Sequence, residues 1–203
     1  IIALNRSYWT MDQVLDGKLL LAKLPQGTLG IENVRILGTL LLTQLHLAAL
    51  QRGGGEPFHA FLDETHHFQG ATMREILSGG RKFDLHLTVA HQNLAQLDPA
   101  NQDALLGNTE RYLFRVGQDD AEALERRPGT EKVGTRYLED LAPFEYRRVG
   151  PDTGSQAIYE MVSPFAPEIV PGAAAYITDQ ARKYMRSRKK QDIEFKREVQ
   201  RWS

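Results

Sequence analysis

FHAFLDE, residues 58–64, is an apolar run that ends in two adjacent acids, Asp63 and Glu64. Such a run is typical of a strand that is buried on both faces of a parallel sheet. Working outward from it, apolar runs predict strands at 18–24, 85–90 and 111–116, and helices are expected at 30–52, 72–78, 103–106 and 119–126. This alternation predicts an α/β fold with a mostly parallel sheet covered by helices.

The longest of the expected helices, residues 30–52, is apolar on nearly all sides. A helix of that kind is normally surrounded by other parts of the protein, so we expect it to be buried. Gly, Thr, Gln and His interrupt its apolar stretch, so the sequence does not predict a membrane-spanning segment there.

A change in composition marks the C-terminal part of the chain. Segments 144–149 and 157–162 flank Asp152-Thr153-Gly154, which predicts a terminal hairpin. A cluster of prolines follows, at Pro164, Pro167 and Pro171. We therefore divide the chain into a body, residues 1–165, and an appendage, residues 166–203, that consists of a Pro-rich linker and a basic helical tail.

Charge is distributed unevenly between these two parts. The chain has 203 residues and a formal net charge of −1, but residues 182–203 carry nine basic and three acidic side chains. The basic tail is either a solvated helix docked on protein or a contact for nucleic acid, an acidic partner or a membrane surface. The absence of Cys excludes disulfides, thiolate metal sites and a Cys nucleophile from these residues.

Polar residues suited to magnesium and phosphate chemistry follow two of the expected strands. A carboxylate such as Asp63 can hold Mg²⁺ through its water shell, and a neighbouring one such as Glu64 can polarise a water. Gln92 ends the next expected strand, within reach of a phosphate or that water. Arg81 follows helix 72–78, and its guanidinium suits phosphate oxygens, in its own subunit or a neighbouring one. The alternative for Asp63 and Glu64 is an ordinary pair of acids at a strand end. The alternative for Arg81 is an ion pair with one of these acids in its own subunit.

Other polar residues have two interpretations. His59, His66, His67, His86 and His91 lie near the acids in sequence, but their spacing matches no zinc pattern, so polar packing is the simpler interpretation. Arg115, between Phe114 and Val116, is either a second arginine that faces phosphate or an ordinary arginine at a strand end.

Three stretches of the body together resemble the ATPase domain of conjugative coupling proteins and HerA–FtsK-type motors. These stretches are FLDETHHF (61–68), ILSGGRKFDLHLTVAHQNLAQL (76–97) and LLGNTERYLFRVGQDDAEAL (105–124). Segments 17–50 and 138–141 also look like that family, so the resemblance extends over roughly residues 15 to 165. It implies a RecA-like P-loop NTPase core in a hexameric ring that moves DNA with ATP and Mg²⁺ in conjugation or type IV secretion. It also implies a cytoplasmic location, at the inner face of the membrane where an upstream anchor is present.

The resemblance also assigns roles to four residues. Asp63 would be the Mg²⁺ acid and Glu64 the catalytic base of the Walker B motif. Gln92 would sense the γ-phosphate, and Arg81 would be the arginine finger supplied to the neighbouring subunit. Asp63, Glu64 and Gln92 would together form this chain's share of the nucleotide site.

One motif of that family does not occur in the sequence. The 203 residues contain no G-x-x-x-x-G-K-S/T loop, whose backbone and Lys supply much of the affinity for phosphate. We expect the loop to lie upstream of Ile1, and we expect this chain alone to be inactive. The alternative is a non-catalytic RecA-like interaction module that has no P-loop.

Overall fold

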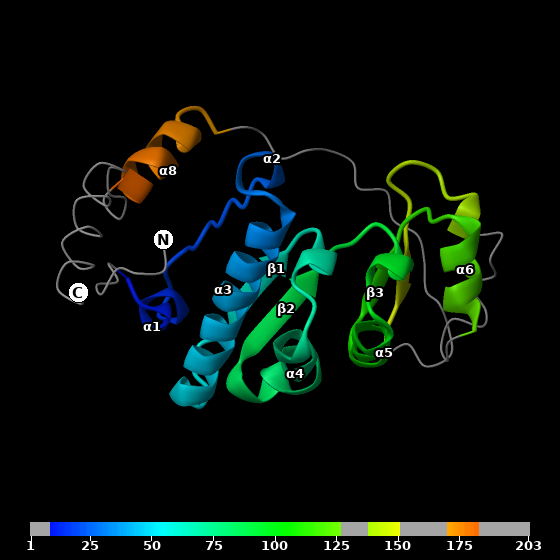
Figure 1. Ribbon diagram of the computed structural model, residues 1–203, viewed down its shortest axis with the longest axis horizontal. Coiled ribbons are helices and arrows are strands. Elements are labelled where there is room, and N and C mark those ends of the chain that lie inside the picture. The colour runs from blue at the N-terminus through cyan, green and yellow to red at the C-terminus, as the bar shows by residue number, and fades with distance from the viewer. Residues whose placement is uncertain (1–8, 127–137, 151–169, 183–203) are drawn as a thin grey trace, which may run out of the picture.

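The computed structural model describes residues 9–126, 138–150 and 170–182 (Figure 1). Helices and strands alternate as the sequence predicts. In chain order they are α1 (Met11–Leu15), α2 (Gln26–Leu29), α3 (Ile31–Arg52), β1 (Phe58–Leu62), α4 (Ala71–Gly79), β2 (Leu85–Val89), α5 (Pro99–Asn108), β3 (Arg111–Leu113), α6 (Gln118–Glu125), β4 (Arg147–Val149) and α8 (Ala173–Arg182). Short 3₁₀ turns are η1 (Thr65–His67), η2 (Gly80–Phe83) and η3 (Leu94–Gln96).

The strand that carries the acids pairs in parallel with the strand that follows it. β1 and β2 are in register from the pair Phe58 and Leu85 to the pair Leu62 and Val89. Because side chains alternate along a strand, Phe58, Ala60 and Leu62 share one face with the alternate residues of β2. That face packs on α3 and α4 and forms the larger hydrophobic core.

The predicted α/β fold with a mostly parallel sheet is confirmed in part, by the small parallel sheet of β1 and β2. β3 and β4 form a separate antiparallel pair, and no described strand joins it to β1 and β2. This second sheet has its own core, which includes Ala121, Leu124, Leu138 and Val149. The described part of the fold is thus a small parallel sheet with helices on one face, beside a small antiparallel sheet.

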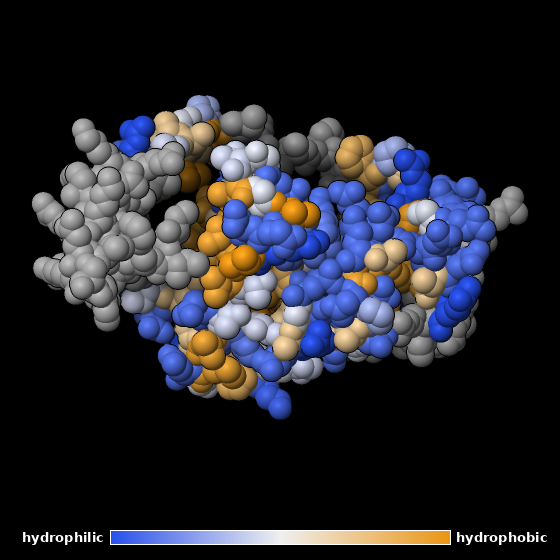
Figure 2. Space-filling view, in the orientation of Figure 1, coloured by the Kyte–Doolittle hydropathy of each residue, from blue (hydrophilic) through white to orange (hydrophobic). Residues whose placement is uncertain are grey.

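The long helix α3 confirms the predicted helix at 30–52, but it is not buried on all sides. Leu42, Leu45 and Ala49 are buried against the sheet, whereas Ile36 and Leu40 are exposed. Figure 2 shows the resulting apolar patches along α3 on the face toward the viewer. By length and composition α3 is the described helix that could cross a membrane, yet one side of it packs against the sheet.

The predicted strand at 18–24 does not form. These residues have no regular secondary structure, and Leu19 and Leu21 are largely exposed. A strand is stable only where a neighbouring backbone takes up its hydrogen bonds. The only strand described beside β1 is β2, so the apolar pattern of 18–24 has no partner here.

Local sequence signals explain why α5 is longer than predicted. The helix expected at 103–106 begins at Pro99, because Pro suits the first helical position. The side chain of Asp98 caps it by accepting a hydrogen bond from Asn101 N–H (2.9 Å). That backbone N–H and the Asn101 side chain hold the pKa of Asp98 below its ordinary value.

The predicted ends of the remaining strands agree only in part with the structure. β3 ends at Leu113, short of the predicted end at 116. Segment 144–149 contains β4, but β4 pairs with β3. The other half of the predicted hairpin, at 157–162, and the tail beyond residue 182 lie outside the described residues, so the predicted division at residue 165 stays a prediction.

A glycine in α3 generates a test of the core. A Cβ added at Gly38 would overlap the ring of Phe68, whereas one added at Gly107 in α5 would meet no atom within 4 Å. We expect Gly38→Ala to lower the free energy of unfolding by about 1–3 kcal/mol. Gly107→Ala, the matched control, should leave it unchanged or raise it by up to about 1 kcal/mol. Urea denaturation measures both, and equal effects would contradict this packing.

Candidate functional site

The acids and Gln92 come together where the two parallel strands end. Asp63 and Glu64 follow β1 directly, and Gln92 lies three residues beyond the end of β2. Since the strands are parallel, their carboxyl ends share one edge of the sheet, here called the carboxyl edge. The Gln92 side-chain amide donates a hydrogen bond to Glu64 Oε1 (2.7 Å). The predicted placement of Gln92 at the same sheet edge as Asp63 and Glu64 is therefore present in the structure.

Thr65 fixes the turn that carries the acids. It is fully buried, and its N–H donates to the carbonyl of Ala90 (2.9 Å). Its hydroxyl lies within hydrogen-bond distance of the carbonyls of Ala90 (2.8 Å) and Leu62 (3.2 Å). One side chain thus ties the end of β1 to the end of β2. Sequence reasoning missed Thr65, because a threonine after two acids gives no signal of its own.

The backbone at Glu64 is in the left-handed region, with φ 52° and ψ 50°. Non-glycine residues adopt it at a cost that persists only where the surroundings enforce it, often at functional sites. In this conformation the Glu64 N–H donates to Asp63 Oδ1 (2.9 Å). The Asp63 side chain is exposed, so the turn presents an oriented carboxylate that a hydrated cation could approach.

Two histidines border the carboxylate of Glu64. His66 Nδ1 is 3.4 Å from Glu64 Oε2, and the His66 and His67 rings are 3.9 Å apart. His67 is buried and contacts the side-chain amide of Gln26. Burial lowers the pKa of His67, and the nearby charges of His66 and Arg35 lower it further. The site therefore favours a neutral imidazole at position 67.

The described histidines do not gather at one point of the fold. His59 and His86 stack on each other on the exposed face of the sheet, with ring centroids 4.9 Å apart, away from His66 and His67 at the carboxyl edge. Within residues 9–126, 138–150 and 170–182, no three His, Asp or Glu side chains are placed to hold a metal ion. The packing interpretation of the histidines stays a prediction.

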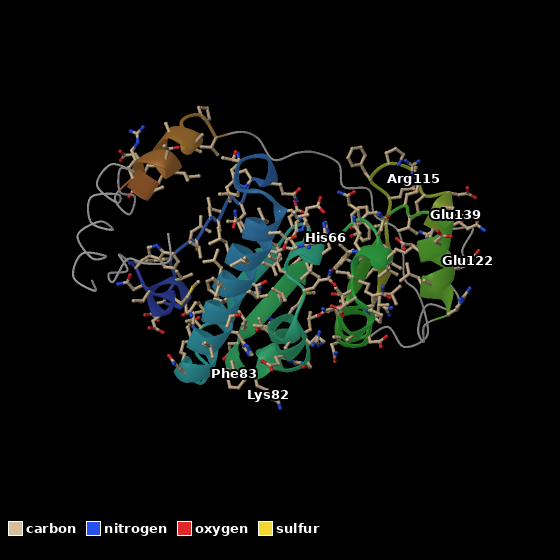
Figure 3. All side chains as sticks on the ribbon, in the orientation of Figure 1. His66, Lys82, Phe83, Arg115, Glu122 and Glu139 are labelled. Atoms are coloured by element: carbon tan, nitrogen blue, oxygen red, sulfur yellow. The ribbon has the colours of Figure 1, made fainter. Side chains whose placement is uncertain are left out.

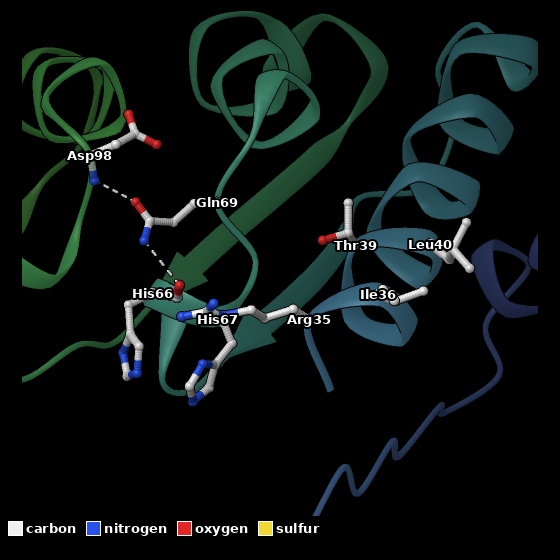
Figure 4. A pocket seen from close by; sticks show the side chains of 8 residues that line it. All are labelled: Arg35, Ile36, Thr39, Leu40, His66, His67, Gln69 and Asp98. Carbon is white, nitrogen blue, oxygen red and sulfur yellow. Dashed lines mark hydrogen bonds between the residues drawn. The ribbon is translucent and has the colours of Figure 1, made fainter. Parts of the chain in front are cut away.

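An open depression of about 590 Å³ adjoins the carboxyl edge (Figure 4). α3 contributes Arg35, Ile36, Thr39 and Leu40, and the segments after the two strands contribute His66, His67, Gln69 and Asp98. Gln69 connects the two segments: its amide donates to the carbonyl of His66 (3.0 Å) and its oxygen accepts from the Asp98 N–H. Figure 4 shows Arg35 reaching from α3 toward His67.

Arg81 lies at the other end of the sheet. It is exposed on η2, which immediately precedes the start of β2. Figure 3 shows His66 at one end of the sheet and Lys82 and Phe83, which follow Arg81, at the opposite end. The five residues of β2, at about 3.3 Å each, separate Arg81 from the carboxyl edge. This position excludes the alternative in which Arg81 pairs with Asp63 or Glu64 of its own subunit.

Arg115 is also separate from the acids. It is exposed and follows β3, in the part of the fold built around the second sheet. Figure 3 shows it well away from His66. The described structure therefore brings together Asp63, Glu64 and Gln92, and places the two arginines elsewhere.

Comparisons with known proteins establish a fold similarity. No protein-family model matches the sequence, and no curated protein matches it. Among solved structures, the fold is similar to VirB4 of Thermoanaerobacter pseudethanolicus, with a TM-score of 0.56 and 20% sequence identity over 70% of this chain. The match covers 40% of the VirB4 chain, so this chain spans less than half the length of that protein. At this identity the similarity supports a VirB4-like fold.

Buried His67 generates a test by pH. Its pKa is lowered from the ordinary 6.5, so the unfolded chain binds more protons than the folded one as the pH falls below 6.5. The free energy of unfolding should therefore decrease from pH 7.5 to 5.5, and should decrease less steeply in His67→Gln. Urea denaturation across this range measures both slopes. If the free energy of unfolding has the same pH dependence in both proteins, His67 has the same pKa in the folded and the unfolded chain.

Proposed function

We propose that this chain is part of an ATP-hydrolysing motor related to type IV secretion ATPases, which moves nucleic acid. The observation that carries the proposal is the hydrogen bond between Gln92 and Glu64 at the carboxyl edge (2.7 Å). Ligands of parallel α/β sheets bind outside the carboxyl ends of the strands. The fold similarity to VirB4 and the resemblance of the motifs to coupling proteins and HerA–FtsK-type motors support the same class.

The residues of the carboxyl edge fit the roles that such a motor needs. Asp63 is exposed and oriented by the Glu64 N–H, which suits a carboxylate that holds Mg²⁺ through water. Glu64 would accept a proton from the attacking water. Gln92 would hold Glu64 in place and contact the γ-phosphate of ATP. The phosphate cradle itself is not among the 203 residues, so ATP binding would require a P-loop from elsewhere in the complete protein.

The position of Arg81 supports the proposal of a ring assembly. Its guanidinium is exposed and lies opposite its own carboxyl edge, so it would act on the nucleotide of a neighbouring subunit. We propose a ring, as a hexamer, that acts on DNA in the cytoplasm. A second candidate, a non-catalytic RecA-like interaction module, is favoured by one observation, the absence of a P-loop from these residues.

The role of Glu64 is tested in the complete protein by Glu64→Gln. The amide keeps the shape and can still bond Gln92, but it lacks the charge and the basic lone pair. Since general-base catalysis contributes about 10²–10⁴-fold, kcat should fall at least about 100-fold while ATP still binds. Steady-state ATPase and equilibrium nucleotide titration measure the two effects. Glu56→Gln, an exposed position just before β1, is the control, and a similar kcat for both variants would remove Glu64 from the mechanism.

The role of Arg81 is tested by mixing two inactive variants of the complete protein, Arg81→Ala and Glu64→Gln. An arginine finger contributes about 10³-fold or more to kcat, so each variant alone should be inactive. In mixed rings some interfaces join an intact Arg81 to an intact Glu64, and ATPase activity should partly return. Lys82→Ala, at the exposed position next to Arg81, serves as the control variant for a lost positive charge. No recovery despite demonstrated co-assembly would rule against action across the interface.

A further inference from the structure

The outward face of the second sheet carries a group of aromatic rings. Side chains alternate along a strand, and Leu113 of β3 and Val149 of β4 belong to the smaller core. Tyr112 therefore lies on the opposite face, and both it and Phe114, which follows β3, are 52% exposed. The ring of Tyr146 is close to both, with centroid distances of 5.4 Å to Tyr112 and 5.5 Å to Phe114. We call these three residues the aromatic platform.

A further exposed ring precedes Tyr146, in a turn that normally carries glycine. The N–H of Glu145 donates to the carbonyl of Ala142 (3.1 Å), so Pro143 and Phe144 are the two central residues of the turn. Phe144 has a φ of 70°, a left-handed value that usually requires glycine at this position. Its side chain is 64% exposed, so the strain does not serve packing in the core. Strained residues of this kind are typical of functional surfaces.

Two arginines border the aromatic platform. Arg148 lies directly opposite Tyr112 in the register of β3 and β4, where it forms an ion pair with Glu110. Arg115 directly follows Phe114, and its side chain is exposed (Figure 3). A guanidinium keeps its positive charge at physiological pH, and its planar shape matches the oxygens of phosphate. The surface thus combines aromatic rings with positive charge on both strands.

Aromatic rings and guanidinium groups on one face match the chemistry of a single nucleic-acid strand. Its unpaired bases stack on aromatic side chains, and its phosphates bind arginine. In a duplex the bases stack on one another, so their faces are hidden from a protein surface. A lone phosphate would use the arginines and leave the rings exposed, whereas an apolar protein surface would use the rings and leave the arginines. A single strand is the partner that uses both.

We propose that the outward face of β3 and β4 binds single-stranded nucleic acid. Bases would stack on the aromatic platform and on Phe144, and Arg115 would contact a phosphate. Binding would depend little on sequence, since every base offers an aromatic face. The inference rests on the proposed function for the presence of nucleic acid, and it adds the form of that nucleic acid and a binding surface away from the carboxyl edge.

The role of the rings is tested by the affinity of the complete protein, without nucleotide, for a fluorescein-labelled strand of oligo(dT). Phe114→Leu keeps an apolar side chain but removes a ring, so the Kd should rise at least about 5-fold, the lower end of what one stacked base contributes. Phe114→Trp keeps a stacking surface and should retain the affinity. The matched control is Phe61→Leu, which removes an exposed ring from the first sheet. Equal Kd values for Phe114→Leu and this control would overturn the proposal.

The phosphate contact is tested separately by Arg115→Gln. On a single strand, each phosphate contact contributes about −0.7 to the slope of log affinity against log salt concentration. We therefore expect this slope to become less steep by about 0.7 in Arg115→Gln and to stay unchanged in Phe114→Leu. Lys82→Gln, at an exposed position of η2, is the control for a lost charge. An unchanged slope in Arg115→Gln would overturn the role of that residue.

Phe144→Gly separates binding from folding. Glycine adopts a positive φ without strain, so the urea midpoint of unfolding should stay unchanged or rise. The Kd for oligo(dT) should nevertheless increase at least about 5-fold. A lower urea midpoint together with an unchanged Kd would show that this ring serves the fold, and would overturn its place in the binding surface.

A photo-crosslink locates the bound strand directly. An oligo(dT) strand that carries one 5-iodouracil reacts on irradiation with an aromatic residue that stacks on that base. Peptide mass spectrometry should find adducts within residues 112–114 or 144–146. Adducts only elsewhere in the protein would overturn the proposal. So would platform variants that change the oligomeric state in sedimentation but not the Kd for oligo(dT), because they would identify this face as a protein interface.

The outcomes separate this inference from the proposed function. Glu64→Gln should bind oligo(dT) like the unaltered protein, because stacking requires no hydrolysis, and Phe114→Leu should retain the ATPase activity measured without nucleic acid. A strand crosslinked to the platform, with full activity in Glu64→Gln, would keep the binding surface and remove the motor mechanism. A platform that binds no strand, in a protein that loses activity on Glu64→Gln, would overturn this inference and leave the motor mechanism in place.

Discussion

The contacts of Thr65 are the constraint on which the candidate site depends. Its hydroxyl and N–H join the ends of β1 and β2 through the carbonyls of Leu62 and Ala90. Thr65 is fully buried, so water cannot take its place as the hydrogen-bond donor to these carbonyls. Losing these hydrogen bonds would therefore lower the stability of the fold. The chain must therefore turn within the two residues between Leu62 and Thr65. That short turn forces Glu64 into the left-handed region and directs its carboxylate toward Gln92.

The same two strands supply both the polar groups of the carboxyl edge and part of the hydrophobic core. One face of β1 and β2 supplies the core with α3 and α4, and the strand ends supply the polar groups. Burial lowers the pKa of His67, which favours a neutral imidazole near Glu64, and His66 Nδ1 lies 3.4 Å from Glu64 Oε2. The strands of the carboxyl edge are thus packed against the core, while the side chain of Asp63 is exposed.

Sequence patterns identify the elements well but not their assembly. The apolar run before Asp63 and the run before His91 correctly predict β1 and β2, although the described helices cover only one face of these strands. Parallel strands share an edge, so the proximity of Glu64 and Gln92 follows from that prediction alone. The predicted strand at 18–24 does not form, and β3 pairs with β4 in a separate antiparallel sheet, because strand pairing depends on which backbone lies alongside. Thr65 and the left-handed backbone at Glu64 leave no signal in sequence, because they are set by contacts between distant residues.

The division of the apolar side chains into two cores has a consequence for folding. The larger core lies between the parallel sheet and α3 and α4, and the smaller one surrounds Leu124 and Leu138 beside β3 and β4. Leu106 of α5 packs against both. Separate cores joined by few contacts tend to open as separate cooperative units. Amide hydrogen exchange in β1 and β2 would then report one opening free energy and exchange in β3 and β4 another, with α5 as the element that couples the two.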